Sequence, residues 1–193
     1  MGKGENVMNR NKVIKIITIF IIVVLMLFLS YFYKQYKFYK NCMEFNITET
    51  ISILCINVKN SKDVIEDVLN NGYANDTQRE TIRLQGPTIY TDIQRIKFYA
   101  HEKTQRPYCN YGIITTSLKN SEDGKWVLTG PEIEGLEVTD EIYKIILDTH
   151  LEVSGNKDFS RLEGDSWLHW FEEIDNKCKT TEPVKYYVQS RDR

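Results

Sequence analysis

The sequence predicts an α+β fold, in which an N-terminal transmembrane helix precedes a small antiparallel sheet packed with helices and closed by disulfides. Three observations predict it. An uncharged apolar run occupies residues 16–33, segments of helical periodicity flank short segments rich in β-branched residues, and all four cysteines follow the apolar run. Helices that flank a few antiparallel strands gather on one face of the sheet, which is the α+β arrangement.

Composition limits the classes of partner. The chain has 193 residues, of which 41% are hydrophobic, and a net charge of −2. After a tail and a membrane helix, the remainder suits one domain of ordinary size. The near-neutral charge argues against nucleic acid as the main partner, because phosphate binding normally needs a large positive excess.

The apolar run is long enough to cross a membrane. Eighteen helical residues span about 27 Å, which nearly matches the hydrocarbon layer. Lys15 and Lys34 flank the run and can reach the headgroups. A cleaved signal peptide would need small residues at the cut site, where Phe28 and Tyr31 stand instead. A buried core helix would rarely be so uniformly apolar, so we favour a membrane anchor.

We therefore predict four segments along the chain. Four basic side chains precede the apolar run and three lysines follow it closely, so the positive-inside rule only slightly favours an inside N-terminus. The confinement of the cysteines to the far side adds weight to this orientation. The expected location is the cell membrane, crossed once, with the domain in the periplasm if the source is Gram-negative. The segments are a cytoplasmic tail at 1–12, a transmembrane signal anchor at 13–33, a juxtamembrane segment at 34–59, and an extracytoplasmic α+β domain at 60–193.

The cysteines are disulfide candidates: Cys42, Cys55, Cys109 and Cys178. Four cysteines allow three pairings, and four separate buried thiols are the alternative. If residues 42–58 form one helix, Cys42 and Cys55 lie about 20 Å apart and cannot bridge. If residues 51–58 form a strand, as their β-branched side chains also permit, the bridge is feasible. We favour Cys42–Cys55 together with Cys109–Cys178.

The first half of the outer domain reads as a helix followed by strands. An apolar stripe predicts a helix over 60–71, which Gly72 ends. Polar residues and a Gly-Pro pair predict a loop over 73–90. Alternating side chains then predict three strands. They are residues 93–100, 111–118 and 125–129, the last two joined by a turn at 120–124.

The second half reads as two helices and a final strand. Thr139 is a candidate N-cap for a helix that runs to about His150. A last helix begins near Asp165 or Ser166, and residues 184–188 resemble a short strand. Within that last helix lies a possible interface of large side chains, which at helical spacing can equally pack in a core. These side chains are Trp167, Trp170 and Phe171.

No catalytic or metal-binding motif stands out. Asp148, His150 and Glu152 provide groups for acid–base chemistry, but charged residues at a helix end are usually solvated and no nucleophile motif accompanies them. The acidic residues between 132 and 141 lack the pattern of a calcium loop. The three histidines show no ligand spacing with cysteine. We therefore expect no metal, no cofactor and no enzymatic activity.

These observations favour a single-pass membrane-anchored protein whose extracytoplasmic domain binds another protein. An accessory subunit of an envelope complex or a toxin-immunity protein has this layout. A small-ligand sensor or carrier is the first alternative, and a viral or phage envelope or lysis-control protein is the second. A hydrolase would require a nucleophile, a histidine and a carboxylate that meet only in the folded chain.

Overall fold

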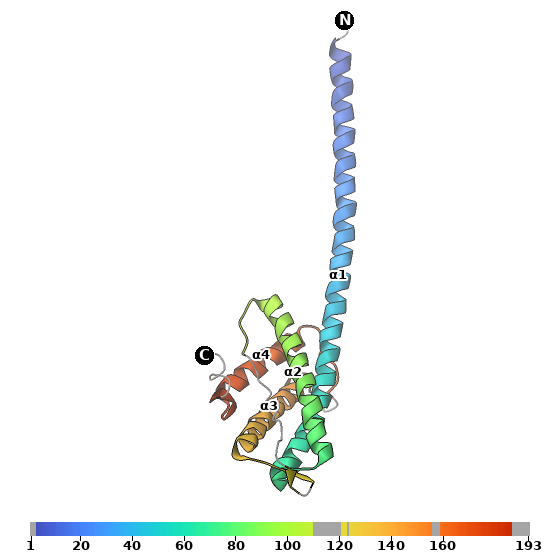
Figure 1. Cartoon of the computed structure of the whole chain (residues 1–193). Helices are drawn as coiled ribbons and strands as arrows, with labels where there is room; N and C mark the ends of the chain where they lie inside the picture. The colour runs from blue at the N-terminus through green and yellow to red at the C-terminus, as the bar shows by residue number, and fades with distance from the viewer. Residues whose placement is uncertain (1–2, 110–120, 123, 156–158, 187–193) are drawn as a thin grey trace. The chain divides into compact units, whose positions relative to one another are not determined.

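The computed structural model describes residues 3–109, 121–122, 124–155 and 159–186, and in these ranges the chain is mostly helical. The chain divides into two compact units, Met1–Phe45 and Asn46–Arg193. The second unit begins inside the segment predicted to be juxtamembrane. The elements are α1 (Lys3–Asn71), β1 (Tyr73–Ala74), α2 (Asp76–Thr104), β2 (Ser121–Glu122), β3 (Lys125–Val127), α3 (Gly130–Ser154) and α4 (Ser166–Thr180) (Figure 1).

The first unit is the N-terminal part of α1. It contains one stretch that is long and apolar enough to cross a membrane, with a mean hydropathy of 3.0 and no buried residue. Its one polar side chain within residues 16–29 is satisfied locally, because Thr18 Oγ1 donates to the Ile14 carbonyl at 2.9 Å. A helix with all its polar groups paired internally is compatible with a transmembrane or signal anchor.

The second unit is built around one helical core. Residues of α1 from Asn46 onward lie alongside α2, and α3 and α4 pack against them (Figure 1). The side chain of Ser61 in α1 also hydrogen-bonds to that of Gln85 in α2. Eight large side chains from the four helices meet at the centre of this core. They are Leu54, Ile93, Ile96, Ile142, Ile146, Trp170, Phe171 and Ile174.

The region 42–58 is helical, so the strand alternative for 51–58 is wrong. The buried positions explain this result, because they recur every three or four residues, which is a helical repeat. These positions are Ile47, Ile51, Leu54 and Val58. The predicted helix over 60–71 is confirmed as the last turns of α1.

The predicted loop over 73–90 and the predicted strand over 93–100 are also wrong, because both lie almost entirely in α2. Asn75 caps this helix: its Oδ1 accepts from Gln78 N at 2.9 Å, and Gln78 Oε1 accepts from Asn75 N at 3.0 Å. Pro87 lies inside the helix and removes one backbone hydrogen bond. The burial of one face of α2 outweighs that loss. The buried residues of this face recur at helical spacing and are Ile82, Gly86, Ile89, Ile93, Ile96 and Ala100.

Within the described residues the sheet is small. It has the strand order β1-β3-β2, and both pairings are antiparallel. The predicted strand 125–129 is present but short, as β3, and Leu128 N beyond it donates to the Gly72 carbonyl at 3.2 Å. The predicted strand 111–118 lies outside the described residues. The expected α+β class is therefore only partly confirmed, as a mostly helical fold with a small antiparallel sheet.

The two later helices are present, and the first is longer than predicted. It begins at Gly130 because Thr129 and Glu132 form a capping box, in which Glu132 Oε2 accepts from Thr129 N at 2.7 Å. The last helix is confirmed as α4. The predicted strand 184–188 is wrong over residues 184–186, which form a helical turn. Lys185 N there donates to the Thr181 carbonyl at 2.8 Å.

The structure contains no disulfide among the four cysteines, so neither of the two predicted bridges, Cys42–Cys55 and Cys109–Cys178, is formed in it. The predicted Cys42–Cys55 bridge is wrong for a geometric reason. Both residues lie in one continuous helix, where a separation of thirteen residues corresponds to about 20 Å, several times the reach of a disulfide.

Candidate functional site

A groove between α1 and α2 is the candidate binding site of the second unit. Its volume is about 410 Å³, which is the size of a pocket for a small molecule or for one or two side chains. Its lining comes from one face of each helix. From α1 come Asn46, Ile47, Glu49, Thr50 and Ile53, and from α2 come Arg95, Ile96 and Tyr99.

The groove has an apolar floor that continues into the core. Ile47 and Ile96 are buried and belong to the core cluster, whereas the Ile53 side chain remains 49% exposed. Tyr99 is half-buried beside it. The spacing of three and four residues on both helices directs these side chains to the same side, because such positions share one helical face. An exposed isoleucine therefore lies at the mouth of an apolar depression.

Both charged residues of the groove form ion pairs, one with a distant residue of the chain and one within its own helix. Glu49 pairs with Arg161 at 3.4 Å, and Arg95 pairs with Asp92 of its own helix at 3.5 Å. Burial raises the pKa of Asp92, and the charge of Arg95 opposes that rise. The Arg95 side chain is still 55% exposed, and an exposed pair of this kind is worth only about 0–1 kcal/mol. Arg95 can therefore turn to an incoming carboxylate at little cost.

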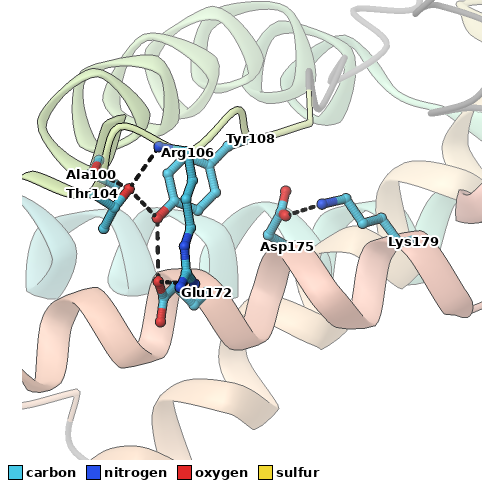
Figure 2. Close-up of polar contacts among 7 residues, drawn as sticks. All are labelled: Ala100, Thr104, Arg106, Tyr108, Glu172, Asp175 and Lys179. Carbon is cyan, nitrogen blue, oxygen red and sulfur yellow. Dashed lines mark hydrogen bonds and ion pairs between the residues drawn. The ribbon is translucent and has the colours of Figure 1, made fainter. Parts of the chain in front are cut away.

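Polar contacts hold the end of α2 against α4 (Figure 2). Thr104 Oγ1 donates to the Ala100 carbonyl at 2.8 Å and lies 3.0 Å from the Tyr108 hydroxyl. Tyr108 and Arg106 then converge on one carboxylate oxygen, Glu172 Oε1, at 3.5 and 3.4 Å. Burial is the main cause that raises the pKa of Tyr108. These contacts fix the chain that leaves α2 on the surface of α4.

A buried carboxylate continues this junction. Asp175 is buried, and its Oδ1 accepts from Cys109 N at 2.8 Å. Its other oxygen pairs with Lys179 one turn later (Figure 2). The Tyr108 ring meets the Phe171 ring edge-on, with centroids 5.1 Å apart. A buried carboxylate with these two partners is a stable arrangement, so the junction is a structural support for the groove wall rather than a reactive centre.

A serine and a histidine also meet, beside a polar depression of about 910 Å³. Ser154 Oγ lies 3.3 Å from His150 Nδ1, and His150 Nε2 lies 3.1 Å from the Ser160 carbonyl. In a catalytic triad the histidine would bond to a carboxylate, whereas His150 bonds to a backbone carbonyl. Ser154 ends α3, where the negative end of the helix dipole disfavours an oxyanion. These contacts bind residues 159–160 to α3.

The acidic neighbours named for acid–base chemistry do not join His150. Glu152 pairs with Lys177 at 2.5 Å, and Asp148 is exposed. Within the described ranges no group of three or more histidine, cysteine, aspartate or glutamate side chains is placed to hold a metal ion.

The residues predicted as functional lie mostly inside the fold. Trp167, Trp170 and Phe171 are at most 2% exposed, so their rings fill the core and none is available at the surface of this unit. Cys55, Cys109 and Cys178 are buried, and Cys42 is exposed. Burial raises the pKa of Cys55 to about 12. Sequence reasoning missed the groove, because its two walls meet only when α2 is recognised as a helix.

Comparison of the chain with protein-family models, with curated proteins and with solved structures finds no match. The candidate site therefore rests on its own geometry.

Proposed function

We propose that this chain is a single-pass membrane-anchored protein whose second unit lies outside the cytoplasm and binds another protein through the groove between α1 and α2. The observation that carries the proposal is Ile53, half exposed above the buried Ile47 and Ile96 and beside the accessible guanidinium of Arg95. An aliphatic surface next to a charge is a common feature of protein contact sites.

The exposed apolar stretch of α1 supports the proposed anchor. Its large side chains are unburied on every side, for example Phe20 and Leu29, and each apolar side chain moved from water into lipid contributes roughly 1.5–3 kcal/mol. About twenty such residues make a span effectively permanent. The outward orientation of the second unit rests on the slight excess of basic residues before the apolar stretch.

The chemistry of the groove specifies its partner. The partner segment presents an aliphatic side chain to Ile53 and the floor, and a carboxylate one helical turn away to Arg95. An amphipathic helix with an acidic edge offers both groups, and docking of such a helix in a groove is a familiar mode of recognition. Asn46 and Thr50 at the rim supply hydrogen bonds that fix its orientation.

Photo-crosslinking in cells tests the site. A photoreactive amino acid replaces Ile53 in one version of the full chain and Leu84 in another. Leu84 is a matched control, because it is also an exposed aliphatic residue of a helix in the second unit but lines a different depression. We expect one discrete crosslinked protein from position 53 and none from position 84. Equal products from both positions, or none from 53, would contradict the proposed site.

A charge exchange tests the chemistry of the partner. In the chain with the crosslinker at position 53, Arg95→Glu is expected to lower the crosslinked yield by about tenfold. The substituted side chain would repel the carboxylate of the partner, which the native arginine attracts. Arg95→Lys keeps the charge and should retain most of the yield. An unchanged yield with Arg95→Glu, at an unchanged melting temperature, would show that no acidic group docks there.

Thiol labelling tests the orientation. Cys42 is the exposed thiol, and the other three cysteines are buried. A membrane-impermeant maleimide is therefore expected to label the native chain in intact cells and to leave Cys42→Ser unlabelled. Labelling of Cys42 only after lysis would place the second unit inside the cell.

A further inference from the structure

We infer that Cys109 and Cys178, which are both thiols in this structure, form a disulfide under oxidising conditions that fastens the chain leaving α2 to α4. The inference rests on the proposed location outside the cytoplasm for its oxidising environment. Its geometric basis is independent of that location and of the binding groove.

The chain that leaves α2 runs along the surface of α4. Arg106 and Tyr108 contact Glu172, the Tyr108 ring meets Phe171, and Cys109 N bonds to Asp175 at 2.8 Å. The contacts thus advance from Glu172 to Asp175 along α4 as the chain advances from Tyr108 to Cys109. Cys178 lies three residues beyond Asp175 on the same helical face, so it is next to the point where the chain reaches Cys109.

Both thiols belong to the same buried cluster. Cys178 is fully buried and Cys109 nearly so, and both are members of the hydrophobic core. The pKa of Cys178 is raised mainly by burial, with further contributions from the charges of Asp175 and Cys109. The closeness of the two residues rests on the backbone of Cys109, which contacts Asp175 three residues before Cys178 in α4.

The other cysteines do not offer a competing pair. Cys42 and Cys55 are separated by thirteen residues of α1. The pKa of Cys55 is raised by burial alone, with no contribution from another thiol. Cys42 and Cys55 therefore cannot bridge each other, and the inference is limited to a single disulfide between Cys109 and Cys178.

The reaction is a thiol–disulfide exchange with a disulfide-bearing oxidant, either a small disulfide or a protein oxidoreductase. One cysteine thiolate attacks the oxidant and releases one of its thiols. The second cysteine then attacks this mixed disulfide, the Cys109–Cys178 bond forms, and the oxidant leaves as its second thiol. The two cysteines lose two electrons and two protons. Both thiols are buried, so an oxidant reaches them during folding or when the chain after α2 lifts from α4.

Oxidation of the purified protein tests the pairing. The full chain in detergent is reduced, exchanged into oxidised glutathione under mild denaturation, refolded and digested. We expect a peptide pair linked through Cys109 and Cys178, with a mass lower by two hydrogens than the sum of the free peptides. Cys55→Ser should leave this product unchanged. Recovery of other pairings, or of free thiols only, overturns the inference.

Thermal unfolding provides the second measurement. The disulfide closes a loop of about 70 residues, so reduction is expected to lower the melting temperature by roughly 10 °C. The double variant Cys109→Ser with Cys178→Ser should melt near the reduced protein and show no change on reduction. A melting temperature unaffected by reduction of the native chain also overturns the inference.

Alkylation of the protein as it is taken from cells separates this inference from the proposed function. If the linked peptide pair forms in vitro while Cys109 and Cys178 from cells are still alkylated as thiols, the disulfide is overturned as a native feature. That result would also count against the outward orientation of the second unit. Crosslinking from position 53 reports on the groove whichever result is obtained.

Discussion

At the scale of single residues, the most informative group is a lysine between two carboxylates. Lys62 in α1 pairs with Glu66 one turn later, and its Nζ lies 3.3 Å from Asp140 Oδ1 in α3. Burial lowers the pKa of Lys62, but its bonds and charge interactions with the two acids outweigh that effect and raise it. For Asp140 the balance is reversed: burial raises its pKa more than Lys62 lowers it.

This balance predicts a pH effect on stability. The pKa of Asp140 is raised above its ordinary value of 3.8 in the folded state, so the folded chain binds this proton more tightly than the unfolded chain. The stability contributed by the group is present below pH 3.8 and is lost as the pH rises through the raised pKa. Asp140→Asn should therefore increase the free energy of unfolding at pH 7, by about 1 kcal/mol or less, and have little effect at acid pH.

Denaturant unfolding of the full chain at pH 3.5 and pH 7 measures this difference. Glu141→Gln is the control, because Glu141 is the next residue of α3 and pairs with Lys144 at 3.6 Å on the same helix. A variant Asp140→Asn that is less stable than the native chain at pH 7, but equal at pH 3.5, would mean that the Lys62 pair outweighs burial.

At the scale of elements, the end of α1 depends on one glycine. Gly72 adopts φ = 72°, its N–H donates to the Val68 carbonyl at 3.0 Å, and its carbonyl accepts from Leu128 N. This left-handed residue ends the helix and directs the chain into β1, which pairs with β3. A side chain at this position would be strained because φ is positive. It would meet no neighbour, since nothing lies within 4 Å of the added Cβ.

Gly72→Ala is therefore expected to lower the free energy of unfolding by about 1 kcal/mol. Gly130→Ala is a matched control. Gly130 begins α3, has no left-handed φ, and has nothing within 4 Å of an added Cβ, so alanine there should be neutral or stabilising by roughly 0.4–1 kcal/mol. Thermal melting followed by circular dichroism compares the two. Equal destabilisation by both would contradict the left-handed conformation of Gly72 as the cause.

At the scale of the whole molecule, the proposed anchor makes a separate prediction. Val23 lies near the middle of the apolar stretch and is 48% exposed. A lysine at the centre of a transmembrane helix costs about 2.5–3.5 kcal/mol of insertion free energy. Val23→Lys should therefore shift a large part of the protein into the soluble fraction after alkaline extraction of membranes, whereas Val23→Leu should remain in the pellet. Retention of both variants would argue against a single spanning helix.

Some features of this protein follow from the sequence by itself, because their physical causes are local. The apolar stretch is a property of composition and length. The end of α1 at Gly72, the return strand β3 and the start of α4 near Asp165 depend on turn residues and on the periodicity of a few neighbours. Each of these was predictable to within a few residues.

The tertiary structure decided the rest. Residues 93–100 carry a short apolar pattern that fits a strand or a helix, and only packing against α1 and α4 makes the helical repeat of Ile93, Ile96 and Ala100 the buried one. The same packing buries Trp167 and Trp170 and brings Cys109 beside Asp175. The groove exists only because these helices meet. Burial is a property of the assembled core, and no local pattern along the chain specifies which side of an apolar segment another element will cover.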